Sequence, residues 1–499
     1  MKAKKLDKWA LKFFSILGLI VYCLIIISVL NRGLGFNYLL VFIILAILLF
    51  LAFKKRKNIS KFYKKHLRAT RILLIILLIF GLMARFSFVF VQSNFDIRDT
   101  LSDTGVHWYG AQQIIDDGKV DQEVGEYENI FPYLSSYTAT LAASMSVFGK
   151  GYNAIVFSNV MFDLISCLCL YVLFSIWKEK KDIGLFAATV WAVNPLQVVF
   201  CGMPLAIVVV NMVVIISILC VFLILRYKDN WLKLCLSSGL LGTFLAIGNA
   251  YRPIFIVFLL VFFVFWLMTV LANKKEMKYA AMSCLIAIAG YLVVGVVPGI
   301  LYSRINPYYS GSKSQAGWSF YVGANYETNG KWSSDDRDVF FGPVLVEQAE
   351  GDIVKANTII LLKGGKRYLE TLSRGQFLSH FLNKTGVLFG DVNNSIYDLP
   401  YIFNFSKQSE KYKIIQDFVM GFYSILLGSL GYFIIGRVRK KEWLKQNTMM
   451  LFLVILISAL FFASLLVEVM NRYSLPLITI LIIIVLGLAF DGNNKKIRI

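Results

Sequence analysis

Several sequence motifs of common enzyme classes are absent from this chain of 499 residues. It contains no GxxxxGK[ST] P-loop, no HExxH, no GxSxG and no GxGxxG that follows a strand. These absences argue against a nucleotide-driven pump and against a serine hydrolase. The seven cysteines all lie in or beside apolar runs, at Cys23, Cys167, Cys169, Cys201, Cys220, Cys235 and Cys284. We therefore expect neither a disulfide framework nor a cysteine-based metal site.

Acidic residues are also few, with 30 aspartates and glutamates against 51 lysines and arginines. In a soluble protein, the formal net charge of +21 would suggest a nucleic-acid partner. Here, however, 58% of the residues are hydrophobic, and a soluble chain cannot hide that much apolar surface. The composition indicates a membrane protein whose cytoplasmic loops retain Lys and Arg, so no nucleic-acid partner is expected.

Long apolar runs predict an all-α polytopic protein with about twelve transmembrane helices, because roughly 20 apolar residues cross ~30 Å of hydrocarbon. The predicted spans are Trp9–Leu30, Tyr38–Phe53, Ile72–Val91, Ala154–Trp177, Ile183–Phe200, Pro204–Leu225, Leu232–Ile247, Pro253–Leu271, Ala280–Tyr302, Phe418–Ile435, Met449–Val467 and Ser474–Phe490. The first run follows a basic N-terminus but lacks a small-residue cleavage site, so we interpret it as an uncleaved span.

Basic segments determine the predicted orientation. The segment from Lys54 to Arg71 carries nine Lys or Arg residues and no acid. Other basic segments are Lys178–Lys181, Arg226–Lys233, Lys274–Lys278, Arg437–Lys445 and Lys495–Arg498. With twelve spans, all of these basic segments lie on the same side of the membrane. The positive-inside rule identifies that side as the cytoplasm. Both termini are then inside, and the large segments Gln92–Tyr152 and Ser303–Asp417 are outside.

The second external segment is too long for a simple connector and predicts a small cap on the outer membrane face. Its Gly/Ser/aromatic stretch, Gly311–Trp332, predicts turns and short extended pieces, whereas Val344–Phe389 has helical periodicity. The predicted parts are therefore two extra spans with a basic loop (1–71), a core with the first external loop (72–302), the cap (303–417) and a three-span module (418–499).

The first external loop concentrates acidic residues and is where we expect the function. Nine carboxylates lie between Asp96 and Glu128, against only Arg98 and Lys119. In this loop, Asp103 is the candidate catalytic base. A carboxylate held at the membrane surface can take a proton from an acceptor hydroxyl. The alternative is that Ser102 and Asp103 merely cap a helix over 104–116, which ends at a glycine, Gly118.

Other residues of this loop are candidates for metal or substrate binding. Asp96 and Asp99 could share a divalent cation through oxygen ligands, or could form a solvated acidic linker. Glu128 is the second candidate catalytic carboxylate, able to orient an acceptor or a metal. Trp108 and Tyr109 could form a platform for a sugar ring or lipid headgroup, or could be interfacial belt residues.

The remaining polar residues of the loop are weaker candidates. His107 could bind a metal but has no partner nearby in the sequence. Phe131-Pro132-Tyr133 breaks the chain before an amphipathic stretch, which we expect to lie along the membrane interface and to end at Phe148-Gly149.

Arg252 and Arg472 lie at the outer ends of predicted spans, where ionisable residues are costly and are therefore functional candidates. A guanidinium fork suits a phosphate, so the two arginines could clamp a lipid phosphate. The alternative is that Arg472 extends to the interface or pairs with Glu468.

Taken in order, several short motifs resemble one enzyme family. They are Ser102-Asp103, Trp108-Tyr109, Ala111, Gly118, Phe131-Pro132-Tyr133, Phe148-Gly149, Arg252-Pro253, Arg472-Tyr473 and Pro476. The chain from Ile72 to Phe490 resembles the multi-spanning glycosyltransferases of the GT-C fold, in the protein-mannosyltransferase and aminoarabinose-transferase branch. The stretch from Gly317 to Trp332 looks like a segment of Gram-positive members.

This resemblance implies a donor and a catalytic residue. The donor would be a polyprenyl-phosphate monosaccharide, and Asp103 would activate the acceptor. The mannosyltransferase branch has an Asp-Glu pair, whereas Thr104 follows Asp103 here, so a second-carboxylate role falls on Glu128 or Asp96 and metal dependence stays open. The implied function is inverting sugar transfer at the outer face of the cell membrane, onto a cell-wall polymer, lipid or protein.

Three other functions remain open from the sequence. A polysaccharide polymerase or ligase would also favour a large external loop. A lipid-linked sugar transporter or flippase would show charges paired near mid-membrane, or inverted repeats. Apart from Arg252, Glu468 and Arg472 at span ends, we find neither in the sequence. The third is an assembly factor without chemistry.

Overall fold

The computed structural model describes residues 67–90, 103–311, 316–391, 409–439 and 448–490, together with the single residue Ile20. Every regular element in these ranges is a helix. The first ten are α4 (Leu67–Phe90), α5 (Asp103–Asp117), α6 (Gln122–Ile130), α7 (Leu134–Phe148), α8 (Asn153–Trp177), α9 (Lys181–Ala192), α10 (Pro195–Cys201), α11 (Ile207–Arg226), α12 (Trp231–Tyr251) and α13 (Phe255–Ala272).

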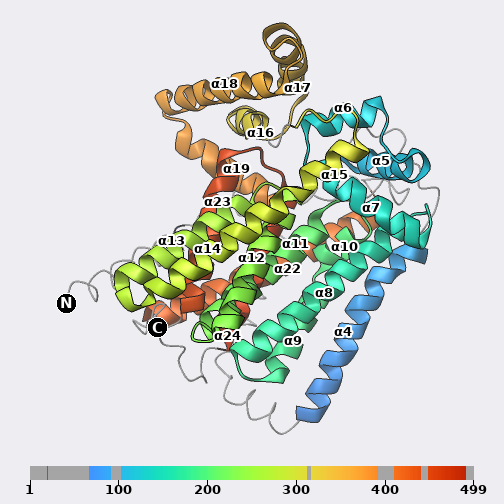
Figure 1. Ribbon diagram of the computed structural model, residues 1–499. Coiled ribbons are helices and arrows are strands. Elements are labelled where there is room, and N and C mark those ends of the chain that lie inside the picture. Colours follow the sequence, from blue (N-terminus) through green and yellow to red (C-terminus); the bar gives the residue numbers. More distant parts are fainter. Residues whose placement is uncertain are drawn as a thin grey trace.

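The second half of the chain adds the cap and the last spans. Its elements are η1 (Lys274–Glu276), α14 (Met277–Gly295), α15 (Val297–Ile305), α16 (Ala316–Gly323), α17 (Ser334–Val339), the π-helix η2 (Phe340–Gln348), α18 (Ile353–Ser373), α19 (Phe377–Gly390), α22 (Glu410–Arg439), α23 (Thr448–Leu466), η3 (Asn471–Ser474) and α24 (Leu475–Ala489). We call α16 to α19 the cap; it stands at one end of the helix bundle (Figure 1).

Within the described ranges, nine helices are long and apolar enough to cross a membrane, and the bent pair α9–α10 raises the number to ten. These helices coincide with the last ten predicted spans, whereas Trp9–Leu30 and Tyr38–Phe53 lie outside the described residues. The bend of 60° falls at Asn194-Pro195, because proline cannot continue the preceding helix. The Asn194 side chain instead caps α10 by accepting the Leu196 N–H.

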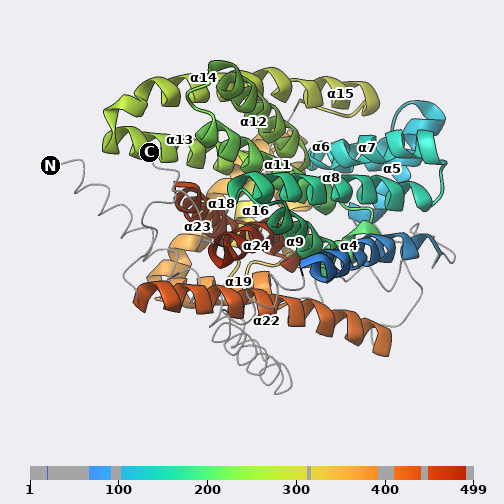
Figure 2. The same cartoon turned by 90° about the horizontal axis from the view of Figure 1, so that it is seen from below.

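In both views α11 lies inside the bundle and α4 lies at its edge (Figures 1 and 2). In α11, 83% of the most apolar 18-residue stretch is buried, and the helix packs on α8, α12 and α24. In α4 only 11% is buried, which leaves side chains such as Ile72 and Phe80 exposed. A helix that exposes so much apolar surface is suited to a lipid environment. The arrangement is that of a polytopic helical membrane protein.

The turns at one end of the bundle carry ion pairs between helices. Ion pairs join its basic turns at the end away from the cap: Arg71–Asp182 (2.6 Å), Arg226–Glu179 (3.0 Å) and Lys228–Glu276 (2.7 Å). The helices α5 to α7 lie at the opposite end, near the cap (Figure 1). We call these the basic end and the cap end.

One part of the cap differs from the sequence-based prediction. Turns and short extended pieces were expected across Gly311–Trp332, but Ala316–Gly323 form helix α16. Trp318 and Val322 are buried in an apolar cluster with residues of α18, and a Cβ on Gly317 would lie 2.0 Å from a backbone oxygen of α18. Packing between helices therefore overrides the local preference of a glycine-rich segment for turns.

A buried ion pair also corrects the sequence analysis, which found no charges paired inside the spans. Arg85 of α4 donates through Nε to Asp163 of α8 at 2.6 Å, and both side chains are 0% exposed. Arg85 Nη1 donates to the carbonyl of Ala192 at 2.6 Å, and Trp191 Nε1 donates to Asp163 at 2.8 Å. Because Ala192 ends α9, Arg85 satisfies a carbonyl that the helix break leaves free.

Candidate functional site

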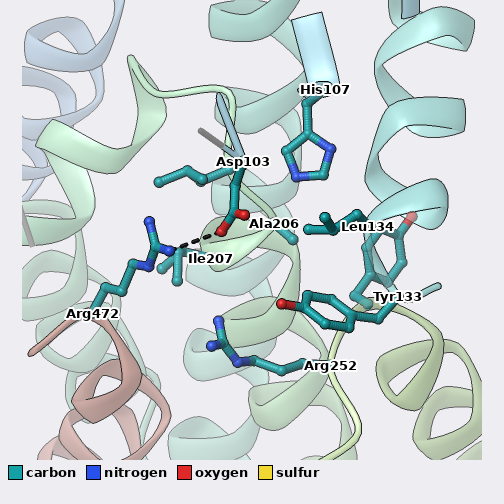
Figure 3. Close-up of a pocket in the computed structure, with 10 residues that line it drawn as sticks. Asp103, His107, Tyr133, Leu134, Ala206, Ile207, Arg252 and Arg472 are labelled. Carbon is teal, nitrogen blue, oxygen red and sulfur yellow. Dashed lines mark hydrogen bonds and ion pairs between the residues drawn. The ribbon is translucent and has the colours of Figure 1, made fainter. Parts of the chain in front are cut away.

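A narrow pocket at the cap end brings together side chains from five separate parts of the chain (Figure 3). Its cavity volume is about 20 Å³, room for about one water molecule. The lining residues are Asp103, His107, Tyr133, Leu134, Leu205, Ala206, Ile207, Tyr251, Arg252 and Arg472. Three residues singled out from the sequence, Asp103, Arg252 and Arg472, therefore meet in one place.

Asp103 begins α5, and the predicted helix and its glycine C-terminus are confirmed, since α5 ends at Asp117 and Gly118 has φ +74°. The carboxylate is more than a local cap. Its Oδ2 accepts from Arg472 Nη2 at 2.8 Å, and its Oδ1 accepts from the Tyr127 hydroxyl at 3.3 Å. A negative charge at a helix N-terminus also interacts favourably with the helix dipole.

Arg472 reaches Asp103 because the cap holds the segment that precedes it. The Glu468 N–H donates to the Ser319 carbonyl at 2.7 Å, and Asn471 Nδ2 donates to the Leu388 carbonyl at 2.8 Å. Both acceptors belong to cap helices, α16 and α19. Arg472 thus contacts Asp103 directly, and it also interacts electrostatically with Glu468, as the alternative from the sequence expected.

A buried lysine strengthens this attachment of the cap. Lys384 of α19 donates to the carbonyls of Gly323 (2.6 Å) and Val467 (2.8 Å). Burial lowers the pKa of Lys384 well below its ordinary value. Burial also raises the pKa of nearby Glu468 to about 7, against the opposing effect of Arg472. The position of the segment that carries Arg472 thus depends on buried polar contacts with the cap.

Arg252 enters the pocket at the C-terminus of α12. Pro253 disfavours helical backbone at the residue before it, and Arg252 accordingly adopts an extended conformation with φ −160° and ψ 124°. Its guanidinium carbon lies 3.7 Å from the ring centroid of Tyr473, and that of Arg472 lies 5.8 Å from the same ring. Among the residues that line the pocket, two guanidinium groups face one carboxylate, Asp103, which favours an anionic ligand. The second acidic group near both arginines is Glu468, and its burial opposes its ionisation.

Glu128 lies behind the pocket rather than in its wall. It is fully buried and accepts hydrogen bonds from Thr138 Oγ1 at 2.6 Å and Ser135 Oγ at 2.7 Å. Burial raises the pKa of Glu128 to about 7, although both hydroxyl donors lower it. The structure therefore brings Glu128 close to the pocket residue His107 through Thr138, and not into direct contact with the cavity.

Trp108 does not offer the open face that a substrate platform needs. Its side chain is only 7% exposed and packs in the main apolar core. Tyr109 is half-buried and packs on Val106 and Val120. Neither residue lines the pocket, because successive residues of a helix turn by about 100° and Asp103 and His107 occupy the pocket side of α5. The aromatic rings in the pocket wall are instead Tyr133 and Tyr251.

A second and larger cavity adjoins the first and shares Tyr133 with it. Its volume is about 320 Å³, and it lies between α12 and the α14–α15 helices. None of the described residues that line it is charged. Four tyrosines contribute to its walls: Tyr133, Tyr291, Tyr302 and Tyr309. Gly295 and Val296, at the break between α14 and α15, form part of the rim, and Val296 is 55% exposed on the bundle surface.

The predicted metal ligands Asp96 and Asp99 lie outside the described residues. Among the residues that the structure does describe, no three His, Cys, Asp or Glu side chains are grouped so that they could hold a metal ion. Metal dependence therefore stays a prediction that rests on Asp96 and Asp99.

Sequence reasoning gave too little weight to His107. It follows Asp103 by four residues, so both side chains lie on the same face of α5 and line the same pocket. Its ring nitrogen Nδ1 lies 3.0 Å from Thr138 Oγ1 on α7. The spacing of four residues was the available signal, whereas Thr138, which lies 31 residues away, had none.

Comparison with known proteins found no family model, no curated protein and no solved structure that matches this chain.

Proposed function

We propose that this chain is an inverting membrane glycosyltransferase of the GT-C type, which moves a sugar from a polyprenyl-phosphate donor to an acceptor outside the cytoplasm. The observation that carries this proposal is the pocket in which Asp103 contacts Arg472 beside Arg252. It combines a carboxylate that can act as a base with two guanidinium groups that suit a phosphate.

In the proposed reaction, Asp103 takes the proton of an acceptor hydroxyl. The acceptor oxygen forms a bond to the anomeric carbon of the sugar, on the face opposite the phosphate. The bond from that carbon to the phosphate oxygen breaks, and its electron pair leaves with the polyprenyl phosphate. Arg252 and Arg472 stabilise the charge that develops on this leaving group, so no general acid is required.

Substrate binding must open the pocket, because a cavity of about 20 Å³ cannot hold a sugar ring. The Asp103–Arg472 ion pair crosses this space at 2.8 Å. A donor phosphate would compete with Asp103 for Arg472, and its binding would release the carboxylate to act as base. In this proposal, binding of the donor phosphate is the step that frees Asp103 to act as the base.

The neighbouring cavity suits the lipid chain of the donor. It has no charged lining residue among those described, and it meets the catalytic pocket at Tyr133. Its rim at the α14–α15 break carries exposed apolar side chains such as Leu292 and Val296. A lipid could thus keep its chain among apolar and aromatic groups while its phosphate reaches Arg252.

The proposed orientation places the basic end in the cytoplasm and the cap end outside, with both termini inside. The ion-paired basic turns at one end of the bundle support this orientation. The active site would then lie on the extracytoplasmic face, where a cytosolic nucleotide sugar cannot serve as the direct donor.

The phosphate clamp is tested by Arg252→Ala and Arg472→Ala. Each variant removes a charge-assisted contact of ~1.5–3 kcal/mol, which corresponds to a loss of roughly 10- to 150-fold in donor affinity. Lysine at either position should restore only part of the affinity, because the planar fork is lost. The measurement is binding of a polyprenyl phosphate to purified protein. The matched control is Arg304→Ala, which removes an exposed arginine of α15. If both pocket variants bind polyprenyl phosphate as the wild type does, Arg252 and Arg472 have a structural role only.

The lipid cavity is tested by Gly295→Leu. A Cβ at Gly295 meets no atom within 4 Å, so the new side chain should be accepted and should occupy part of the cavity. Displacing about two methylene groups of a bound chain costs ~1.6 kcal/mol, so we expect KM for the lipid donor to rise about tenfold. Gly421→Leu on α22, where a Cβ also meets open space, is the control. If the two variants have equal KM values for the lipid donor, the lipid chain does not bind in this cavity.

A further inference from the structure

His107 stands in the pocket wall one helical turn after Asp103, yet the proposed reaction does not use it. Its side chain is 1% exposed, and its ring lies over the cavity that Asp103, Tyr133 and Arg252 also face (Figure 3). The rings of His107 and Tyr137 pack edge to face, with their centroids 4.9 Å apart. A fixed imidazole beside a candidate base is well placed to contact a substrate.

Hydrogen bonds behind His107 determine which ring nitrogen carries the proton. Thr138 Oγ1 lies 2.6 Å from the Glu128 carboxylate and 3.3 Å from the Leu134 carbonyl, so its single hydrogen goes to the shorter, charge-assisted contact. The same oxygen can then only accept from His107 Nδ1, at 3.0 Å. The proton of the neutral ring therefore resides on Nδ1, and Nε2 keeps its lone pair.

The ring is neutral because burial lowers the pKa of His107 to about 4. Asp103 favours the charged form, and Arg472 opposes it. The pocket thus contains one carboxylate, two guanidinium groups and three uncharged side chains that can hydrogen-bond, namely His107, Tyr133 and Tyr251. Of these three, the neutral His107 offers at Nε2 a nitrogen that can only accept, whereas each tyrosine hydroxyl can also donate. An uncharged acceptor is suited to a hydroxyl group and offers nothing to a phosphate oxygen.

We propose that His107 Nε2 accepts a hydrogen bond from a hydroxyl of the sugar that the lipid phosphate carries, and that Thr138 and Glu128 are positioning residues that maintain this tautomer. The inference rests on the proposed function, because it assigns the hydroxyl to the group attached to the phosphate held by Arg252 and Arg472. A site built to accept a hydroxyl proton discriminates against a sugar that lacks this hydroxyl.

The tautomer can be measured without any activity, since the chain has only three histidines. Protein labelled with ¹⁵N in its imidazole rings is studied by NMR at about pH 8, above the pKa of about 7 for Glu128, and the signals of His107 are assigned by their loss in His107→Gln. We expect a protonated Nδ1 and an unprotonated Nε2. In Thr138→Val, which keeps the shape but removes the hydroxyl, the Nε2-protonated form should appear. A wild-type ring protonated on Nε2, or on both nitrogens, would overturn the proposal.

The source of the hydroxyl is tested with two lipids, a bare polyprenyl phosphate and a polyprenyl-phosphate glucose. We expect only the sugar-bearing lipid to shift the Nε2 signal. A shift with the bare phosphate would show that Nε2 senses the phosphate and would overturn the assignment. If the bare lipid binds in an Arg472-dependent way but neither lipid moves Nε2, the phosphate clamp stands and the role of His107 fails.

Steady-state kinetics separates this role from a purely structural one. Thr138→Ser keeps the hydroxyl and should retain the wild-type KM for the sugar donor, whereas Thr138→Val should raise it about tenfold, the loss of one neutral hydrogen bond. Equal KM values for the two variants would contradict a tautomer-fixing role of Thr138.

Discussion

Replacing Asp103 by Asn should reduce sugar transfer by about 10²- to 10⁴-fold, the usual loss when a general base is removed. Asparagine keeps the size of the side chain and its ability to cap α5, so folding and expression should stay near normal. The rate is measured in membranes with a polyprenyl-phosphate sugar at equal protein level. Asp117→Asn, at the exposed C-terminus of the same helix, is the control and should behave as wild type.

A charge exchange distinguishes catalysis by Asp103 from a structural role. Asp103 and Arg472 form an ion pair at 2.8 Å, so Asp103→Arg combined with Arg472→Asp can rebuild the pair in reverse. If the pair only holds η3 against α5, the double variant should regain most of the transfer rate that either single change loses. We expect stability to recover and transfer to stay low, because the base and the phosphate contact have exchanged places.

Arg85→Met should destabilise the protein by ~3–5 kcal/mol, because it leaves Asp163 buried without its partner. The same change removes the donor to the Ala192 carbonyl at the break between α9 and α10. The expected result is a large drop in Tm in detergent and in folded yield. Exchanging both charges for apolar groups, in Arg85→Met with Asp163→Leu, should recover part of the loss, because no unpaired buried charge remains.

The matched control is a second ion pair of α4, which joins this helix to α9 instead of α8. Arg71 and Asp182 form an ion pair at 2.6 Å, but their side chains are 50% and 24% exposed. Exposed pairs contribute about 0–1 kcal/mol, so Arg71→Met should change Tm little. Equal effects of Arg71→Met and Arg85→Met would show that the buried pair does not hold the broken helix.

The ten spans that lie within the described residues could be predicted from the sequence because each is a continuous apolar run bounded by charge or by proline. The helix after Asp103 could be predicted as well, since an N-cap residue and a terminal glycine bracket it. The stretch predicted to end at Phe148-Gly149 forms α7 with that boundary, and Gly149 has φ +85°. In all these cases the deciding signal is local.

Contacts between distant segments could not be predicted in the same way. Arg85 and Asp163 each interrupt an apolar run only once, so neither prevents a span, and 78 residues separate them. The helix α16 depends on the close approach of Gly317 to α18, which its own residues do not reveal. Trp108 was predicted to be a substrate platform or an interfacial belt residue, because nothing in its neighbourhood shows which face of α5 packs inward.

The candidate site could be predicted only in part. Asp103 and Arg472 are 369 residues apart, and only the order of short motifs suggested that they act together. Their ion pair agrees with that suggestion. The hydrogen-bonded chain from His107 through Thr138 to Glu128 needed the packing of α5 on α7, which Gly110 permits, since a Cβ there would lie 2.7 Å from the Thr138 methyl group.

The most direct measurement follows both products of a polyprenyl-phosphate sugar labelled in its sugar, with purified protein in lipid vesicles that contain envelope acceptor material. The proposed function predicts release of free polyprenyl phosphate together with transfer of label to the acceptor, and both should be lost in Asp103→Asn. A flippase would move the intact lipid across the bilayer and release no polyprenyl phosphate. Release or transfer that persists in Asp103→Asn, or movement of an uncleaved lipid by the wild-type protein, would contradict a glycosyltransferase built on this pocket.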